Sequence, residues 1–175
     1  MSRSSKTPRG EGTETGFMDE TWIPDGYTSL TPYLCVEGAA AAIDFYSSVF
    51  GAEVVGRNDL PDGRVAHAEL QLASGRFQLS DPAPDHHLRA PSGDQVVDHS
   101  YVLYVPDVDV TYAAAIAHGA HGYGEPETFV TGDRYALVLD PFGHRWALMT
   151  RVEQVDPEEA ARRVDAWLAE SERAG

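Results

Sequence analysis

The sequence has a single cysteine, Cys35, and few basic side chains. One cysteine excludes an intrachain disulfide and every zinc site built from several thiolates, so a metal ion would need His, Asp or Glu ligands. Only 13 Lys and Arg residues stand against 28 Asp and Glu residues, which gives a formal net charge of −15. A protein this acidic repels phosphate backbones and anionic lipids, so we expect neither nucleic acid nor a membrane as its partner.

Long apolar runs are also missing. No stretch approaches the length that spans a bilayer, and the first residues hold no apolar segment of signal-peptide length. We therefore expect a cytoplasmic protein. The N-terminal residues through Gly16 are mostly Ser, Thr, Gly and charged residues, a composition too poor in apolar groups to offset the entropy of ordering. This composition predicts a disordered tail over residues 1–26.

From Ser29 onward, short apolar segments alternate with turn signals such as Pro61-Asp62-Gly63. Their periodicity predicts strands of about six residues and two longer helices. The strands are predicted at residues 29–36, 53–58, 65–72, 76–80, 99–105, 125–130, 134–139 and 144–151, and the helices at residues 39–50 and 108–118. The order strand, helix and three strands therefore occurs twice.

A constant spacing between landmarks supports a duplication. Val36 and Val105 are 69 residues apart, Gly51 and Gly119 are 68 apart, Gly63 and Gly132 are 69 apart, and Gly75 and Gly143 are 68 apart. We infer two βαβββ modules, at residues 29–81 and 99–151. Chance alignment of turn glycines is the alternative, and the agreement of strand and helix ends argues against it.

The C-terminal segment begins as helices commonly do. Asp156 is a suitable N-cap, Pro157 suits the first turn, and acidic residues follow near the positive end of the helix dipole. The apolar stripe behind them consists of Ala160, Val164, Trp167 and Leu168. We predict a helix within residues 153–175 that packs on the domain or on a partner subunit.

Alternation along the predicted strands separates the two faces of each sheet. In residues 65–72 the apolar set is Ala66, Ala68, Leu70 and Leu72, and the opposite set is Val65, His67, Glu69 and Gln71. If the apolar sets pack under the helices, the opposite sets line a concave face suited to an organic ligand. The same alternation assigns to this face Tyr33, Gln78, Tyr104, Arg134, Ala136 and Val138.

Two of these side chains are candidate catalytic residues. His67 and Glu69 lie two residues apart on one strand face, where a His and a carboxylate can act as an acid–base pair near neutral pH. A solvated or cross-strand polar pair is the alternative interpretation. Arg134 could bind a carboxylate or phosphate of a ligand through its planar guanidinium, with a salt bridge to Asp133 or Glu69 as the alternative.

Several stretches resemble a known family in sequence and order. They are Leu30-Thr31-Pro32-Tyr33-Leu34, Ile43-Asp44-Phe45-Tyr46, Phe50-Gly51-Ala52, residues 63–70, Gly132-Asp133-Arg134-Tyr135 and Asp140-Pro141-Phe142-Gly143-His144. The chain resembles the vicinal oxygen chelate superfamily of glyoxalase, bleomycin-resistance and extradiol dioxygenase proteins, and its PhnB-like branch in particular. The resemblance implies an α+β fold over residues 27–152, in which paired βαβββ modules form a cup-shaped mixed sheet. It also implies a homodimer that binds a small organic ligand.

In metal-dependent relatives, the resemblance places the metal ligands at positions that here hold Thr31, Gln78, Ser100 and Ala147. These side chains are not a set that binds a divalent metal, since such sites use His, carboxylate or thiolate ligands. We therefore expect no metal and no other cofactor. A one-residue change of register would bring His99 inward, and a metal would then have His67, Glu69 and His99 as ligands.

These observations favour a metal-independent protein that sequesters or acts on a small organic metabolite or antibiotic. Its expected ligand contacts are Tyr33, Gln78, Tyr104 and Arg134. The alternative is a metal-dependent lyase, isomerase or dioxygenase of the same superfamily, so the sequence leaves open whether the protein is an enzyme. A third interpretation is a protein-interaction module that uses the acidic surface and the C-terminal helix.

Overall fold

The computed structural model describes residues 22–93 and 96–174, which form two modules of the same topology and a C-terminal helix. The first module contains β1 (Tyr33–Cys35), α1 (Ala39–Phe50), β2 (Glu53–Asp59), β3 (Val65–Gln71) and β4 (Arg76–Ser80). Its mixed sheet has the order β1-β4-β3-β2, with β1 parallel to β4 and the other pairs antiparallel. Most of the predicted tail, residues 1–21, lies outside the described residues.

The second module repeats this arrangement, with the two short strands β6 and β7 in the place of β2. It contains β5 (Tyr101–Tyr104), α2 (Val108–Ala117), β6 (His121–Gly122), β7 (Glu127–Thr128), β8 (Asp133–Leu139) and β9 (Arg145–Arg151). The strand order is β5-β9-β8-β6, with β5 parallel to β9 and β7 paired with β8. A short 3₁₀ turn, Pro84–His86, lies between the modules, and α3 (Pro157–Ala174) follows them. The α+β fold of two βαβββ modules with a C-terminal helix is therefore confirmed.

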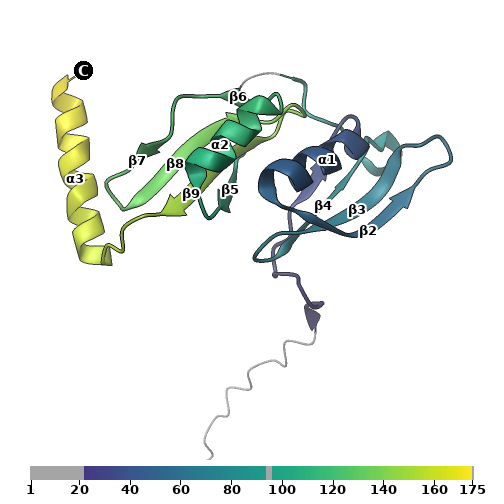
Figure 1. Ribbon diagram of the computed structural model, residues 1–175, viewed down its shortest axis with the longest axis horizontal. Helices are drawn as coiled ribbons and strands as arrows, with labels where there is room; N and C mark the ends of the chain where they lie inside the picture. Colours follow the sequence, from purple (N-terminus) through teal and green to yellow (C-terminus); the bar gives the residue numbers. More distant parts are fainter. Residues whose placement is uncertain (1–21, 94–95, 175) are drawn as a thin grey trace, which may run out of the picture.

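Figure 1 shows how the modules are arranged. α1 and α2 lie near each other in the middle of the molecule, and each covers the sheet of its own module. The two sheets are separate and neither closes into a barrel. α3 lies at the end of the second module that is farthest from the first.

The two central helices begin with different capping groups. Asp107 precedes α2 and its side chain accepts a hydrogen bond from the Val110 N–H at 3.1 Å. Gly38 precedes α1 and has no side chain to offer, so Asp81, at the end of β4, caps this helix instead. Asp81 Oδ1 accepts the N–H groups of Gly38 and Ala39 at 2.9 and 3.0 Å, and Oδ2 accepts that of Val65 at 2.7 Å.

Two predicted strands are reduced to three residues or fewer. The strand predicted at residues 29–36 is only β1, because the hydroxyls of Thr28 and Thr31 bond to nearby carbonyls and Pro32 has no N–H for a ladder. The strand predicted at residues 125–130 is reduced to β7. Its neighbour Pro126 lacks an N–H, and Gly124 has a φ of 133°, which interrupts an extended strand.

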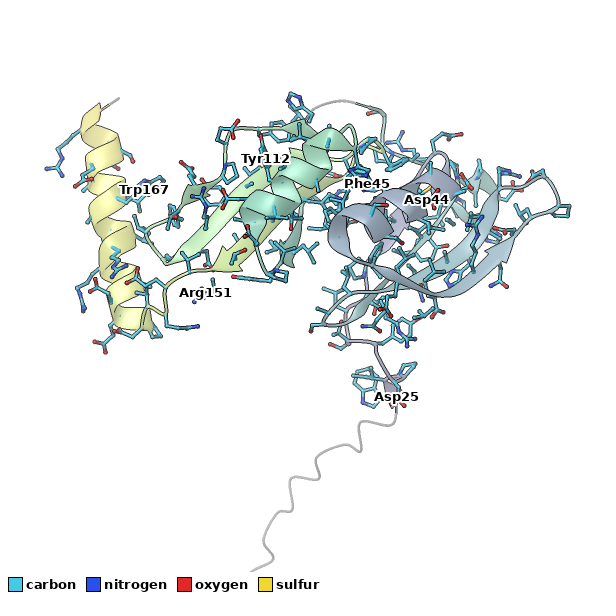
Figure 2. All side chains as sticks on the ribbon, in the orientation of Figure 1. Asp25, Asp44, Phe45, Tyr112, Arg151 and Trp167 are labelled. Atoms are coloured by element: carbon cyan, nitrogen blue, oxygen red, sulfur yellow. The ribbon has the colours of Figure 1, made fainter. Side chains whose placement is uncertain are left out.

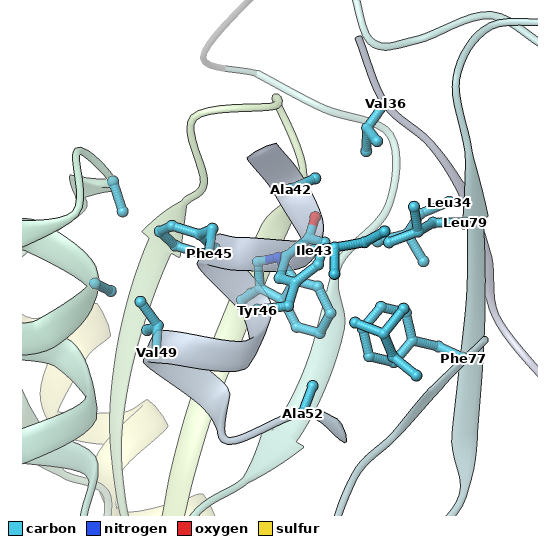
Figure 3. Packing of buried hydrophobic residues seen from close by; sticks show 14 of the residues in the cluster. Leu34, Val36, Ala42, Ile43, Phe45, Tyr46, Val49, Ala52, Phe77 and Leu79 are labelled. Carbon is cyan, nitrogen blue, oxygen red and sulfur yellow. The ribbon is translucent and has the colours of Figure 1, made fainter. Parts of the chain in front are cut away.

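An aromatic core joins the two modules. Figure 3 shows its α1 side, where Tyr46 faces Phe77 of β4. The Tyr46 hydroxyl and the Trp146 indole N–H both donate to Asp140 Oδ2, at 2.7 and 2.8 Å. Asp140 Oδ1 accepts the backbone N–H groups of Phe142 and His144, both at 2.9 Å. The motif at residues 140–144 is therefore a buried junction in which both carboxylate oxygens are hydrogen-bonded.

The face assignment was wrong along β8. Ala136 and Val138 are buried in the core beneath α2, not on the open face. They occupy the places that Ala68 and Leu70 occupy in β3, so the repeat spacing here is 68 residues and not 69. A one-residue difference moves every side chain of a strand to the other face. Arg134 consequently lies on the α2 side of the second sheet.

The face assignment was also wrong at the start of β3. Val65 is buried and Ala66 is exposed, opposite to the prediction, although Ala68 and Leu70 lie in the core as expected. The pairing of β2 with β3 shifts register between Asn58 and Asp59, beside this end of the strand. Such an irregularity reorients the first residues of a strand and leaves the later ones unchanged.

Candidate functional site

Polar side chains gather on the open face of the first sheet, opposite α1. Tyr33 is paired with Gln78 across β1 and β4, and Gln78 is paired with Glu69 across β4 and β3. Cross-strand partners share a face, so these three side chains point the same way. His67 joins them because it lies two residues before Glu69 on β3. We call this surface, formed by Tyr33, His67, Glu69, Arg76 and Gln78, the polar face.

Glu69 lies at the centre of an ion-pair network on the polar face. Its two oxygens lie 3.5 Å from His67 Nε2 and 3.6 Å from Arg76 Nη1. The Tyr33 ring lies 5.9 Å from the His67 ring, centroid to centroid. All of these side chains are partly exposed, so a ligand in the solvent can reach them. The structure thus brings together four of the six predicted site residues, namely Tyr33, His67, Glu69 and Gln78.

The environment of Glu69 keeps it ionised. A hydrogen bond from the Tyr27 hydroxyl lowers the pKa of this carboxyl, and the hydrogen bond and charge of His67 and the charge of Arg76 lower it further. Glu69 is therefore a carboxylate at neutral pH, able to accept hydrogen bonds or a proton. In an acid–base pair it would orient His67, and the imidazole would carry the proton.

The sequence interpretation missed two residues of this network. The Tyr27 hydroxyl accepts a hydrogen bond from Gln78 Nε2 at 3.1 Å, and its ring lies 5.1 Å from the Arg76 guanidinium carbon. The same hydroxyl lowers the pKa of Glu69. Arg76 has the same strand parity as Gln78, so alternation along β4 could have identified it. Tyr27 precedes every predicted strand, and no periodic signal connects it to the sheet.

A cavity of about 610 Å³ lies beside this network, between the turn before β4 and the strand β5. Its walls are mainly apolar, with Arg76 at one side and Tyr104 at the other. The Tyr104 hydroxyl lies 3.4 Å from Asp133 Oδ1, and the Arg151 guanidinium binds both oxygens of Asp133. Tyr104 therefore borders the cavity but belongs to the second module and not to the polar face.

Arg134 is apart from the other predicted ligand residues. Its Nε and Nη2 donate to the two oxygens of Asp109 on α2, both at 2.6 Å. This bidentate pair holds the guanidinium against the helix and raises the pKa of Arg134, because the hydrogen bonds to Asp109 favour the charged form. The predicted salt bridge partners, Asp133 and Glu69, are not the ones that it uses. Figure 2 labels Arg151, whose guanidinium holds Asp133 instead.

The donor set does not fit a divalent metal. Thr31, Gln78, Ser100 and Ala147 supply no imidazole, carboxylate or thiolate. His99 is engaged with Asp98, whose Oδ1 lies 2.6 Å from His99 Nδ1. Across residues 22–93 and 96–174, no three His, Cys, Asp or Glu side chains form a group that could hold a metal ion. That the protein acts without a metal ion stays a prediction.

None of the helices in the described part of the chain combines the length and apolar character needed to cross a membrane.

Comparisons with known proteins place the whole two-module region in one family. Residues 27–148 match the family model described as Glyoxalase/Bleomycin resistance protein/Dioxygenase superfamily. The protein Mb0911c of Mycobacterium bovis is 38% identical over 137 residues, which cover 75% of this chain and 88% of the relative.

Solved structures agree with the family match. TioX from a Micromonospora species has a TM-score of 0.55 at 22% identity, over 71% of this chain and 98% of its own. The PhnB protein of Bacillus cereus has a TM-score of 0.56 at 19% identity, over 70% of this chain and 99% of its own. At these identities the two structures show a shared fold.

Proposed function

Because the chain belongs to the glyoxalase/bleomycin resistance protein/dioxygenase superfamily, we propose that it binds a small organic molecule at the polar face without a metal ion. One observation carries the proposal: the network around Glu69 lies on an open sheet face, and its member Arg76 also lines a mainly apolar cavity of about 610 Å³. Apolar walls with a few well-placed polar groups are typical of sites for organic ligands. The ligand could be a metabolite or an antibiotic.

Each predicted contact residue has a distinct part in this proposal. Tyr33 offers a half-exposed ring, Gln78 offers an amide that can donate and accept, and Tyr104 offers a second ring across the cavity. Arg134 is no longer among the proposed contacts, because α2 holds it elsewhere. Arg76 takes its place as the basic group beside the ligand.

Catalysis by His67 and Glu69 is the second candidate function. The 3.5 Å separation of His67 Nε2 and Glu69 Oε1 is slightly longer than a hydrogen bond, and such pairs commonly tighten when substrate binds. The pair could move a proton to or from a ligand held between Tyr33 and Gln78. This activity would place the protein among metal-free lyases or isomerases.

Binding and turnover can be separated with two variants, His67→Ala and Glu69→Ala. A small-molecule library is screened by thermal unfolding and by NMR, and the hits are then incubated with each variant. A sequestering protein should still bind its ligand in both variants, because the ligand contacts are spread over several residues. An enzyme should keep binding and lose turnover. The proposal would be contradicted if none of the library compounds perturbed the polar face.

The metal-dependent alternative has its own test. The dialysed protein is analysed for metal content, and its thermal unfolding is followed as Ni²⁺, Zn²⁺, Mn²⁺ and Fe²⁺ are added. We expect no stoichiometric metal and no rise in the midpoint. Near-stoichiometric metal with a raised midpoint would overturn metal independence and would favour a metal-dependent lyase, isomerase or dioxygenase.

We also propose that the protein is a homodimer. β1 pairs only with β4 and β5 only with β9 within the described chain, so both are edge strands, and β5 lines the cavity. The apolar side chains of Val102 and Tyr104 on β5 are 60% and 54% exposed. A second subunit would cover both features. Light scattering during gel filtration tests this proposal, and a monomer at micromolar concentration would contradict it.

A further inference from the structure

A short segment before β1 lies against the polar face. We call residues 22–28 the strap. It contains a turn in which the Tyr27 N–H donates to the Pro24 carbonyl at 3.1 Å, and Figure 2 shows Asp25 of the strap at the edge of the first module. Gly26 has a φ of 84°, and a Cβ on it would lie only 2.7 Å from Arg76 Nε. The positive φ favours glycine at this position, and a larger residue would also displace the end of the Arg76 side chain.

Tyr27 carries the contacts between the strap and the polar face. Its hydroxyl accepts a hydrogen bond from Gln78 Nε2 at 3.1 Å and lies close enough to Glu69 to lower the pKa of that carboxyl. Its ring lies against the Arg76 guanidinium, with 5.1 Å between the ring centroid and Cζ. One phenol therefore engages three side chains of the polar face at once.

We infer that Tyr27 occupies a subsite for a hydroxylated aromatic group, and that the ligand of this protein displaces the strap and places its own phenol there. The inference rests on the proposed function and deepens it, since it names the chemical class of the ligand. The ring of the ligand would lie on Arg76, and its hydroxyl would lie between Glu69 and Gln78.

The chemistry of the three partners is selective for a neutral hydroxyl. Glu69 is ionised and can only accept, whereas the Gln78 amide donates at this position. A hydroxyl donates one hydrogen bond and accepts others, so it satisfies both partners. A carboxylate or phosphate would instead face the negative charge of Glu69, and Arg76 already binds Gln71 Oε1 at 2.9 Å and lies 3.6 Å from Glu69.

The strap is held weakly enough to be displaced. It forms no strand pairing, and every residue in it except Ile23 and Tyr27 is exposed. Thr28 and Arg76 both border the 610 Å³ cavity, so the space for the remainder of a ligand begins where the strap ends. A ligand with a phenol and an apolar body would fill both the subsite and the cavity.

The test uses 4-methylphenol, which is the tyrosine side chain as a free molecule. Its binding to the full-length protein and to Tyr27→Ala is measured by NMR titration, with toluene as the probe that lacks the hydroxyl. Removal of Tyr27 should lower the Kd for 4-methylphenol at least about tenfold, because the competing internal phenol is gone. Toluene should bind Tyr27→Ala more weakly than 4-methylphenol. Trp22→Ala, a matched change in the same strap, should leave the Kd unchanged.

A second variant covers the case in which Tyr27→Ala disturbs the fold. Gly26→Ala strains the strap backbone, because a φ of 84° suits glycine, and removes no side chain of the polar face, so it should also tighten binding of 4-methylphenol. Equal Kd values for the wild-type protein and both variants, or equal binding of toluene, would overturn the inference. Other library compounds that still bind the polar face would leave the proposed function standing, whereas no binder at all would remove both.

Discussion

The two modules have the same topology but very different open faces. The first face carries His67, Glu69 and Arg76 in one ion-pair network. The middle of the corresponding face of the second module is apolar, with Val102, Tyr135, Leu137, Ala147 and Met149. Its charged groups lie at the two ends, where Arg145 stands at the position of Arg76 and Arg151 pairs with Asp133 beside Tyr104. Duplication of a backbone therefore does not duplicate its chemistry. The histidine–carboxylate pair that could act on a ligand occurs only in the first of the two faces, and the middle of the second face is apolar.

Disrupting the junction between the modules should have the largest effect. Asp140→Ala leaves the Tyr46 hydroxyl, the Trp146 N–H and two backbone N–H groups without their buried acceptor. We expect a loss of about 4 kcal/mol in the free energy of unfolding. Urea denaturation measures it. Asp140→Asn, which keeps one carbonyl oxygen, should lose less, and a change below about 1 kcal/mol in the Ala variant would contradict the assigned role.

The capping groups sharpen the comparison between the modules. Asp81→Ala removes three hydrogen bonds at a buried site and should cost about 3 kcal/mol, since α1 and β3 both lose an acceptor. Asp107→Ala removes an exposed N-cap of α2 and should cost about 1 kcal/mol. Urea denaturation of both variants gives the difference. Equal costs would show that the two helices are capped by equivalent interactions after all.

His144 provides a pH-dependent test of the same junction. Its Nε2 donates to the Cys35 carbonyl of the first module at 3.2 Å, and its buried Nδ1 has no partner among the described residues. Burial lowers the pKa of His144 below 6.5. The Asp140 charge and the hydrogen bond to the Cys35 carbonyl raise the pKa, but by less than burial lowers it. The folded state thus binds fewer protons than the unfolded state. Stability is complete above about pH 6.5 and falls as the pH decreases below it.

The slope cannot exceed about 1.4 kcal/mol per pH unit for one proton. Urea midpoints measured between pH 7.5 and 5 should therefore decline less in His144→Gln than in the wild-type protein. His121→Gln, which changes an exposed histidine on β6, is the control and should follow the wild-type curve. Parallel curves for all three proteins would show that His144 does not titrate differently in the folded state.

Arg134 should give the smallest effect. Its pair with Asp109 is partly exposed, with side-chain exposures of 31% and 52%, so Arg134→Ala should change the free energy of unfolding by less than about 1 kcal/mol. Ligand affinity should not change, because the guanidinium lies on the α2 side of the sheet. Arg76→Ala, the matched change on the polar face, should weaken binding. Titration of a library hit against both variants shows which arginine contacts the ligand. Weaker binding to Arg134→Ala would support the prediction from the sequence that Arg134 is a ligand contact.

The sequence predicted the fold better than the site. Helix α1 has the predicted limits because Gly51 ends it and its apolar periodicity is clear. The repeat spacing was a less reliable guide to which face of a sheet a residue lies on. Gly63 and Gly132 are 69 residues apart, whereas the equivalent Ala68 and Ala136 are 68 apart. That single residue decides on which face Arg134 lies. Tyr27 could not be predicted at all, because its contacts with Glu69 and Gln78 span more than 40 residues and follow no local pattern.

The central claim is that ligands bind the polar face of the first module. Chemical-shift mapping of the isotope-labelled protein during a small-molecule screen tests it most directly. The account predicts that hits shift the resonances of His67, Glu69 and Gln78, together with those of β5 across the cavity. Hits that shift only α2, β8 and the residues around Arg134 would contradict it.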